Sequence, residues 1–421
     1  MENINFYQIL FPLALILVLS KLLSIGCRKI GLPQVIGLLA TGILLGLITL
    51  IPNQPLITDD ATKGIAFLAE IGVVLIMFSA GLETDIKQVK ETGVASLIIT
   101  SLGVIVPLGL GFLVALVLPG SLSEPKILFR NIFYGVILTA TSVSVTVAAL
   151  KELGRLTSPI GTAIVSAAIL DDIIGVIILS VIISLDGALV SGNSSDVGKQ
   201  IGIVFGKTAL FFVFAIIVGI LVRMVFKKLS NKYDHHRRLP IFALAFAFFY
   251  AYAAEAWFGI ADITGAFFAG IFLSGTRDTG YIEKRADTTS YLIFTPVFFA
   301  KVGLTSIGSF SSIEPSFILF GLLFVLAGIA GKLFGCGLGA KISKYSFKDS
   351  FRCGIGMMVR AEVCLISAQK GIDAGIISSS IQPFILVLIL LTSFLTPIIL
   401  KATYKNEVHE DVSEMVTTIG N

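Results

Sequence analysis

Charged residues are scarce in this chain, and their scarcity excludes most classes of soluble protein. Only 14% of the 421 residues are Asp, Glu, Lys or Arg, whereas soluble proteins carry about 25%. Hydrophobic residues make up 55% of the chain. The net charge of +4 comes from basic residues spread along the sequence, so no nucleic-acid partner is indicated. The composition predicts a protein that is surrounded by membrane lipid and crosses the bilayer several times.

Cysteine and histidine are rare as well, with four and three residues. The cysteines have no spacing typical of a metal site, and three histidines cannot complete one. Three of the cysteines fall at or near the predicted cytoplasmic side, where disulfides are not expected. We therefore expect no cofactor and no zinc or disulfide framework. The four cysteines are Cys27, Cys336, Cys353 and Cys364.

Long apolar segments make up most of the chain. A transmembrane helix needs roughly 20 apolar residues. Thirteen segments can be delimited, which predicts an all-α membrane protein with thirteen transmembrane helices. They cover residues 5–26, 32–50, 62–82, 92–118, 131–150, 158–184, 200–226, 239–257, 260–275, 290–307, 314–341, 350–371 and 380–402.

Basic residues alternate between the two ends of these segments. The loops after odd-numbered segments and the C-terminal tail hold 22 Lys and Arg residues, and the opposite loops hold six. Cytoplasmic loops are the ones enriched in Lys and Arg. We therefore expect the N-terminus outside the cell and the C-terminus in the cytoplasm.

The chain also contains an internal repeat. Segments two and three recur as segments nine and ten, with glycines at the same spacing. Successive segments cross the membrane in alternate directions, so a shift by seven segments, an odd number, gives the two copies opposite orientations. Many secondary transporters contain such inverted repeats. Small residues at helix interfaces can resemble one another without a repeat, but these matches occur in the same order. The matched pairs are Gly37 with Gly265, Gly42 with Gly270 and Gly81 with Gly303.

Two adjacent carboxylates interrupt the apolar segment 158–184. Asp171 and Asp172 stand near its middle, where one Asp costs roughly 2.5–3.5 kcal/mol on insertion. Ionisable residues inside a membrane helix mark functional sites by default and need partners. Neighbours on a helix point about 100° apart. The two aspartates therefore have different surroundings, and we expect them to have different roles.

Segments 131–150 and 350–371 occupy equivalent positions in the repeat, and both are poor continuous helices. Broken helices at such positions present carbonyl groups and helix dipoles to a binding site at the middle of the membrane. The hydroxyl groups in the first segment could instead bond to their own helix. The interrupting residues are Thr139, Thr141, Ser142, Ser144 and Thr146 in one segment, and Gly354, Gly356, Arg360 and Glu362 in the other.

Two lysines compete as the partner of the aspartates. Lys332 lies in segment 314–341 among closely spaced glycines, which allow helices to approach each other. Lys301 lies toward one end of segment 290–307 and could extend to the membrane interface. We therefore favour Lys332.

These motifs resemble the monovalent cation/proton antiporters of the second large family, and in particular the NapA-type bacterial sodium/proton antiporters. The resemblance covers nearly the whole chain. It rests on MFSAGLE from Met77, TATSVSV from Thr139, ILDDIIG from Ile169, GMMVRAE from Gly356, and Lys332.

The resemblance implies a homodimer in which two six-helix repeats are joined by a linker helix and two broken helices cross. The membrane domain would cover residues 1–403, followed by a short cytoplasmic tail at 404–421. Some potassium-efflux relatives carry a cytoplasmic nucleotide-binding domain after the last helix, and none is expected here. The implied parts are dimerisation helices at 5–50 and 239–275, core helices at 62–184 and 290–402, and a linker at 200–226.

The resemblance also implies a role for each site residue. Asp172 would be the obligate ligand of sodium, and Asp171 the second carboxylate, paired with Lys332 when no cation is bound. Thr141 and Ser142 would lie at the crossover of the first broken helix. Arg360 and Glu362 would neutralise broken-helix ends at the second.

The function implied is electrogenic exchange of sodium or lithium for protons across a prokaryotic cell membrane. Potassium/proton exchange remains the alternative. An aspartyl protease is disfavoured, because it needs two carboxylates that share a proton and these diverge on one helix. A cation channel is also disfavoured, since channels build their filters from rings of equivalent groups.

Overall fold

The computed structural model consists of helices and the turns that join them, with no β-strand among the residues that it describes. Those residues are 7–29, 34–51, 54–84, 86–142, 146–147, 149–150, 153, 155, 158–191, 197–232, 238–310 and 315–419. Within these ranges, the description leaves out the side chains of 86–92, 186–191, 197–201, 229–232, 306–310, 315–316, 362 and 405–419.

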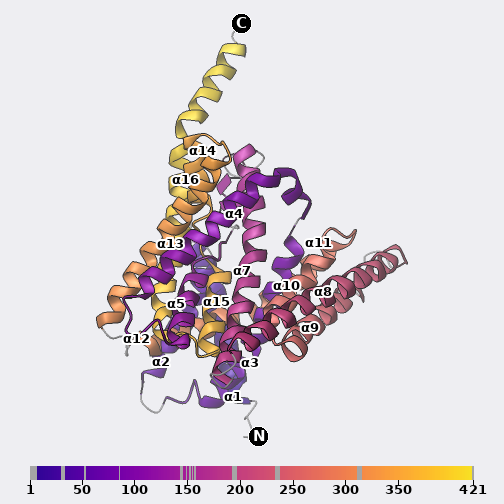
Figure 1. The fold of residues 1–421 in the computed structure, drawn as a ribbon, viewed down its shortest axis with the longest axis vertical. Coiled ribbons are helices and arrows are strands. Elements are labelled where there is room, and N and C mark those ends of the chain that lie inside the picture. Colours follow the sequence, from indigo (N-terminus) through magenta and orange to yellow (C-terminus); the bar gives the residue numbers. More distant parts are fainter. Residues whose placement is uncertain are drawn as a thin grey trace.

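The contacts between helices define two packing groups. Figure 1 labels the helices that belong to them. The first, here called the paired-glycine group, consists of α1 (Tyr7–Lys29), α2 (Gln34–Thr49), α3 (Asp59–Glu83), α9 (Arg238–Phe258), α10 (Asp262–Leu273) and α12 (Thr295–Phe310). The second, here called the crossing group, consists of α4 (Ile86–Ala115), α5 (Pro125–Ile137), α7 (Pro159–Ser191), α13 (Pro315–Ile342), α14 (Phe347–Gly356), α15 (Glu362–Asp373) and α16 (Gln382–Ile419).

The remaining elements connect these groups. The long helix α8 (Val197–Lys232) packs against α7 of the crossing group and against α9 and α10 of the paired-glycine group. Helix α11 (Thr279–Thr289) and the π-helix η2 (Ser290–Phe294) lead directly into α12. The 3-10 turn η3 (Ser379–Ile381) precedes α16.

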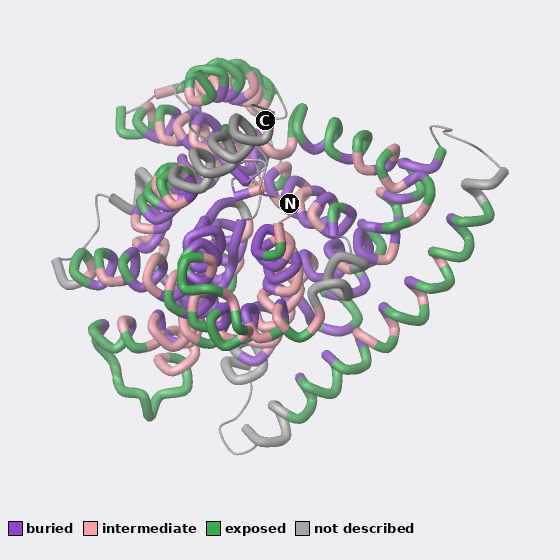
Figure 2. Tube along the Cα trace, turned by 90° about the horizontal axis from the view of Figure 1, so that it is seen from above, coloured by how far each residue is buried: buried purple, intermediate pink, exposed green. Residues whose placement is uncertain are grey.

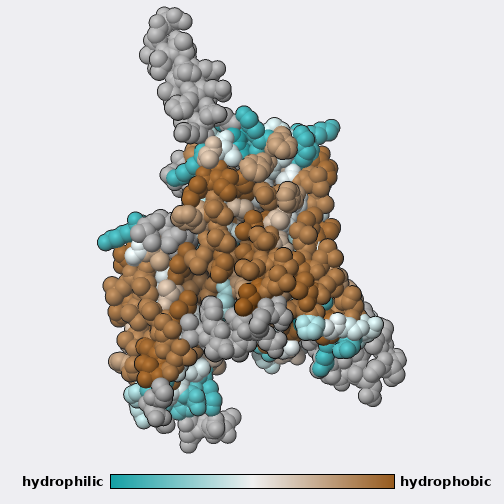
Figure 3. Space-filling view, turned by 90° about the vertical axis from the view of Figure 1, so that its left-hand side faces the viewer, coloured by the Kyte–Doolittle hydropathy of each residue, from teal (hydrophilic) through white to brown (hydrophobic). Residues whose placement is uncertain are grey.

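The surface identifies a multi-pass membrane protein. Eight of the described helices are long and apolar enough to cross a bilayer, and α2 and α10 are shorter apolar helices. Figure 3 shows a hydrophobic band with hydrophilic residues gathered toward its two ends. Seen along the long axis, buried residues gather at the centre and exposed ones lie on the outer helices (Figure 2). The N- and C-termini lie at opposite ends of the molecule (Figure 1).

Local sequence signals explain several helix starts. Proline opens both α5 and α7, a position where its missing N–H costs nothing. Ser158 caps α7, since its hydroxyl accepts the Gly161 N–H at 3.1 Å. Ser346 caps α14 in the same way through the Asp349 N–H at 3.0 Å. These caps supply partners for N–H groups that a helix start leaves free.

Two helix crossings inside the paired-glycine group depend on glycine. In one, Gly42 of α2 meets Gly303 of α12, and in the other, Gly81 of α3 meets Gly270 of α10. Each glycine lies directly against a backbone carbonyl of the other helix, so a Cβ atom would collide with main chain. The carbonyl is that of Ala300 for Gly42, Leu39 for Gly303, Phe267 for Gly81 and Phe78 for Gly270.

These contacts follow the pairing that the sequence repeat predicts. The repeat equates Gly42 with Gly270 and Gly303 with Gly81. The crossing of α2 with α12 is therefore equivalent to the crossing of α10 with α3. The crossing group shows a further equivalent pair. Gly135 of α5 rests on a carbonyl of α4, and Gly354 of α14 rests on a carbonyl of α13 in the same geometry. The two halves of the chain thus pack alike.

Helices α3 and α12 cover segments 62–82 and 290–307, which are predicted as core helices. They pack mainly against α10 and α2. The physical reason is the backbone contact at the paired glycines, which brings these helices closer than side-chain packing allows.

Substitution of Gly81 by Ala is expected to destabilise the protein by about 1–3 kcal/mol, the usual cost of overpacking. The added methyl group would collide with the Phe267 carbonyl, which is main chain and cannot rotate away. Gly206→Ala on α8 is the matched control, because nothing lies within 4 Å of its Cβ position. Thermal unfolding of the purified proteins measures both, and an unchanged melting temperature for Gly81→Ala would contradict the close crossing.

Candidate functional site

The breaks expected in segments 131–150 and 350–371 are present. Helix α5 ends at Ile137, and the backbone through Ser142 is not helical. Helix α14 ends at Gly356, and helical structure resumes at Glu362 with α15. Both breaks fall within otherwise apolar segments, where unpaired backbone groups are costly. They therefore require partners from elsewhere in the protein.

The two interrupted segments supply those partners to each other. One backbone bond and two hydroxyl bonds join them across the crossing. The Thr139 hydroxyl donates instead to Val136 of its own helix at 2.8 Å, so the alternative of local bonding holds for this residue. The bonds across the crossing run from Ser142 N to Val359 O (2.9 Å), from Thr141 Oγ1 to Met357 O (3.4 Å) and from Thr146 Oγ1 to Gly356 O (2.6 Å).

A buried ion pair lies on α7 and α13. Lys332 Nζ donates to Asp171 Oδ1 at 2.6 Å, and both side chains are 0% exposed. The other carboxylate oxygen of Asp171 is buried and accepts no hydrogen bond from the described residues. Asp172 is only partly buried, as the divergence of neighbours on a helix predicts. The structure thus gives the two aspartates different surroundings.

Glycine makes room for the lysine between α4 and α13. A Cβ atom on Gly103 of α4 would lie 3.7 Å from Lys332 Nζ and too close to Cys336 Sγ. Gly331, next to the lysine, rests on the backbone of Pro107. The glycines around Lys332 therefore bring α4 against α13 and leave a narrow space for the lysine side chain.

Arg360 stands in the break between α14 and α15, and its side chain reaches the end of α5 in the other interrupted segment. Its Nη2 donates to the carbonyls of Leu138 at 2.7 Å and Gly328 at 3.1 Å, and the side chain is fully buried. Leu138 follows the last residue of α5, so the guanidinium lies at the negative end of that helix dipole. The Arg360 N–H donates to Thr392 Oγ1 at 3.1 Å. The side chain of Glu362, predicted to act similarly, lies outside the described residues.

Lys301 belongs to a different set of charges. Its Nζ lies 3.3 Å from Glu70 Oε1 and 3.9 Å from Asp373 Oδ2. Lys370 Nζ in turn lies 2.9 Å from Glu70 Oε2 and 2.9 Å from Asp262 Oδ1. The structure therefore brings Lys332, and not Lys301, to the aspartates of α7. Lys301 pairs with these carboxylates instead of extending to the membrane interface.

Sequence reasoning overlooked several of these residues. Glu70 is a carboxylate within the apolar run AFLAEIGVV, and the rule that singled out the aspartates also applies to it. Thr100 of α4 is buried and donates to the Ala167 carbonyl at 2.8 Å, one turn before Asp171. A lone threonine in an apolar helix carries no such signal, because it usually bonds to its own helix.

The arrangement suits reversible binding of a proton or a small cation. Hard cations prefer oxygen ligands, and the site offers carboxylate, hydroxyl and carbonyl oxygens. The Lys332 ammonium balances one of the two carboxylates. Asp172, partly buried beside this pair on the same helix, is the second carboxylate of the site.

Known proteins resemble this chain along nearly its whole length. Residues 14–406 match the family described as "Sodium/hydrogen exchanger, transmembrane". The chain is 33% identical over 400 residues to the Na(+)/H(+)-K(+) antiporter GerN of Bacillus cereus, covering 94% of this chain and 97% of that protein. It is 32% identical over 390 residues to a Na(+)/H(+) antiporter of Enterococcus hirae, covering 92% and 96%.

The fold agrees with that of a solved structure. The sodium proton antiporter MjNhaP1 from Methanocaldococcus jannaschii at pH 8 superposes with a TM-score of 0.70 at 21% identity, covering 93% of this chain and 95% of that one. This likeness establishes the fold, while the family match and the relatives above 30% identity establish membership. The chain belongs to the sodium/hydrogen exchanger family, and it is a cation/proton antiporter and not an enzyme.

Proposed function

We propose that this protein exchanges sodium or lithium for protons at Asp171 and Asp172. The observation that carries the proposal is the fully buried pair of Lys332 and Asp171 at 2.6 Å, one residue from Asp172. Burial of a lone charge is costly, whereas a pair balances itself. Asp172, which is only partly buried, would be the group at which proton and cation compete.

Competition at one carboxylate is enough to couple the two fluxes. A carboxylate binds either a proton or a partly dehydrated cation, so arrival of one releases the other. Thr141 and Ser142, at the crossing, would supply further oxygen ligands for the cation. If the site faces the two sides of the membrane alternately, each turn of the cycle exchanges one kind of ion for the other.

Alternating access would come from movement of the crossing group relative to the paired-glycine group. The equivalent glycine contacts in the two halves support an inverted repeat of two six-helix units, joined by α8 as linker. In transporters with such repeats, one bundle rocks against the other around a fixed site. This proposal includes thirteen membrane crossings, an external N-terminus and a cytoplasmic C-terminus. It also includes a homodimer in the cell membrane.

Lys332 would be the second proton carrier. A cation bound at Asp172 would weaken the pair of Lys332 with Asp171, and the lysine could then release its proton. Two protons would therefore move for each sodium, and the exchange would carry net charge. Such exchange responds to voltage, at about 2.3 kcal/mol per charge per 100 mV.

Potassium/proton exchange is the second candidate. One relative is named a Na(+)/H(+)-K(+) antiporter, and a Saccharomyces cerevisiae relative at 27% identity is named K(+)/H(+) antiporter 1. The site itself has no feature that excludes potassium. We rank sodium first because three relatives above 30% identity carry sodium in their names.

Reconstituted vesicles test this function directly. If protons and cation compete, the apparent affinity for sodium should improve as pH rises and reach a plateau once the site is deprotonated. The range to scan is about pH 6 to 9, on both sides of neutral pH. Dequenching of a pH-sensitive dye, with sodium, lithium and potassium salts in turn, measures both affinity and selectivity.

Two outcomes would contradict the proposal. An apparent affinity that does not change with pH would rule out simple competition. Flux that does not saturate and needs no counter-ion gradient would indicate a channel. Saturation by potassium at concentrations where sodium has no effect would favour the second candidate.

A further inference from the structure

A cluster of charges joins the two helix groups away from the aspartates. Lys370 of α15, in the crossing group, pairs with Glu70 of α3 and Asp262 of α10, both in the paired-glycine group. Lys301 of α12 pairs with Asp373 of α15, so here the lysine belongs to the paired-glycine group and the acid to the crossing group. We call these five residues the bridging cluster. Three of its four ion pairs connect one group to the other.

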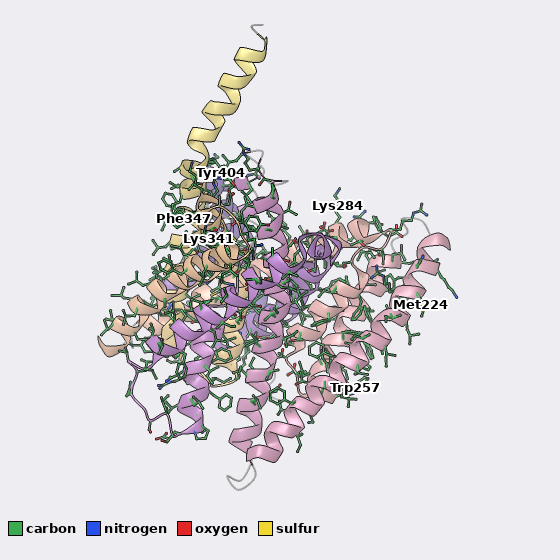
Figure 4. The ribbon with its side chains drawn as sticks, turned by 45° about the horizontal axis from the view of Figure 1, so that its top comes forward. Met224, Trp257, Lys284, Lys341, Phe347 and Tyr404 are labelled. Carbon is green, nitrogen blue, oxygen red and sulfur yellow. The ribbon has the colours of Figure 1, made fainter. Side chains whose placement is uncertain are left out.

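The bridging cluster lies between the crossing and one end of the molecule. Lys370 is eight residues beyond the start of α15 at Glu362, which corresponds to about 12 Å along the helix. Asp262 begins α10, five residues after Trp257, which Figure 4 shows at the end opposite to Lys341 and Phe347. In the proposed orientation, this is the external end.

Burial and hydrogen bonding suggest a closed contact. The side chains of Lys301, Lys370 and Asp262 are 14%, 17% and 16% exposed, although they are charged. Gln382 at the start of α16 adds two bonds, to Thr305 of α12 at 3.2 Å and to Gln369 of α15 at 3.1 Å. Polar groups from both helix groups therefore meet here and form hydrogen bonds to one another.

The cluster is absent from the equivalent positions of the repeat. The repeat partners of Glu70 and Asp262 are Leu292 and Gln34, which are uncharged. A contact required by the repeated architecture would recur in both halves. These acids therefore serve one end of the molecule only.

We propose that the bridging cluster is an ionic gate that closes the external side of the exchanger. Lys370 must release Glu70 and Asp262 whenever the crossing group moves away from the paired-glycine group. Glu70 and Asp373 are about 40% exposed, so water reaches the cluster and no single bridge is strong enough to prevent opening. This inference deepens the proposed function, because it rests on exchange by movement of the two groups.

A reversible cross-link tests the gate. Asp262→Cys and Lys370→Cys are introduced together with Cys27→Ser, since the other three native cysteines are fully buried. A short bifunctional methanethiosulfonate reagent then joins the two positions in proteoliposomes. We expect sodium/proton exchange to fall by about tenfold or more and to recover when a reductant removes the link. Tenfold corresponds to 1.4 kcal/mol.

A cross-link inside one helix group is the matched control. Lys21 of α1 donates to the Tyr291 hydroxyl at 2.8 Å, and both residues belong to elements packed in the paired-glycine group. Lys21→Cys with Tyr291→Cys should keep exchange after linking. Full exchange by the linked Asp262/Lys370 variant would overturn the gate. Activity measured before the reagent is added tests the proposed exchange, and the effect of the cross-link tests the gate. One hypothesis can therefore fail without the other.

Labelling provides a second readout that needs no transport activity. The substitution Ser142→Cys places a thiol at the crossing, and its labelling rate reports whether the crossing is open to water from the external side. Lys370→Gln should raise its labelling rate by an impermeant thiol reagent by about tenfold, and Lys370→Arg should restore slow labelling. Equal labelling rates in all three proteins would also overturn the gate.

Discussion

Substitution of Asp172 by Asn is expected to reduce sodium-driven proton movement to the level of empty liposomes at every pH. The amide has nearly the same shape as the carboxylate, but it cannot carry the exchanged proton and is a much weaker cation ligand. The buried pair consists of Lys332 and Asp171, so the variant leaves both of its members unchanged. The measurement is dye dequenching in proteoliposomes, together with thermal unfolding.

The neighbouring substitution Asp171→Asn is the control for this result. It leaves Lys332 as a fully buried charge without its carboxylate, so it should lower thermal stability, whereas Asp172→Asn should not. The proposed roles thus predict loss of transport without loss of stability at one position. Sodium-driven proton movement that survives in Asp172→Asn would reject the assignment of Asp172 as the cation ligand.

Substitution of Lys332 by Gln is expected to destabilise the protein by roughly 3–5 kcal/mol, the cost of leaving a buried charge unpaired. Asp171 would lose the ammonium at 2.6 Å and keep its burial. The number of protons exchanged per sodium should fall, because one of the two proposed proton carriers is gone. We expect sodium binding to be partly retained and exchange to shift from electrogenic toward electroneutral. Currents on a solid-supported membrane measure this directly.

A double substitution separates charge from packing. Asp171→Asn combined with Lys332→Gln removes both charges and should recover most of the lost stability, because no buried charge remains unpaired. Lys301→Gln should keep the charge moved per sodium, since Lys301 pairs with Glu70 and Asp373 instead. Full sodium-driven current in Lys332→Gln, with loss of current in Lys301→Gln, would show that the wrong lysine was chosen.

Much of the fold follows from the cost of placing chain in lipid. Apolar length locates the membrane-crossing candidates, but not the polar helix α11. Hydroxyl and glycine residues in an apolar frame locate the breaks after Ile137 and Gly356. Two adjacent acids and a lysine among glycines likewise predict that Lys332 pairs with an aspartate, and the family resemblance implies Asp171, which the structure pairs with it. All these signals are local, since a residue type conflicts with its immediate surroundings.

Other features depend on contacts that no local pattern encodes. Arg360 donates hydrogen bonds to the carbonyls of Leu138 and Gly328, and no sequence pattern predicts these two acceptors. The position of α3 beside α10 depends on glycines that meet carbonyls of another helix. The π-helix before α12 likewise has no marker in its residues, SYLIF. Such features arise from tertiary packing, where two distant segments jointly set the geometry.

The bond between Arg360 and Leu138 has a consequence for the order in which the protein is made. These residues are 222 positions apart, so the end of α5 enters the membrane long before its partner exists. At a synthesis rate of about 5–20 residues per second, the delay is roughly 10–45 seconds. During that time, the carbonyls after α5 must find temporary partners, because bilayer hydrocarbon offers none. The first half of the chain, although it packs like the second, therefore completes its own structure only when the second half arrives.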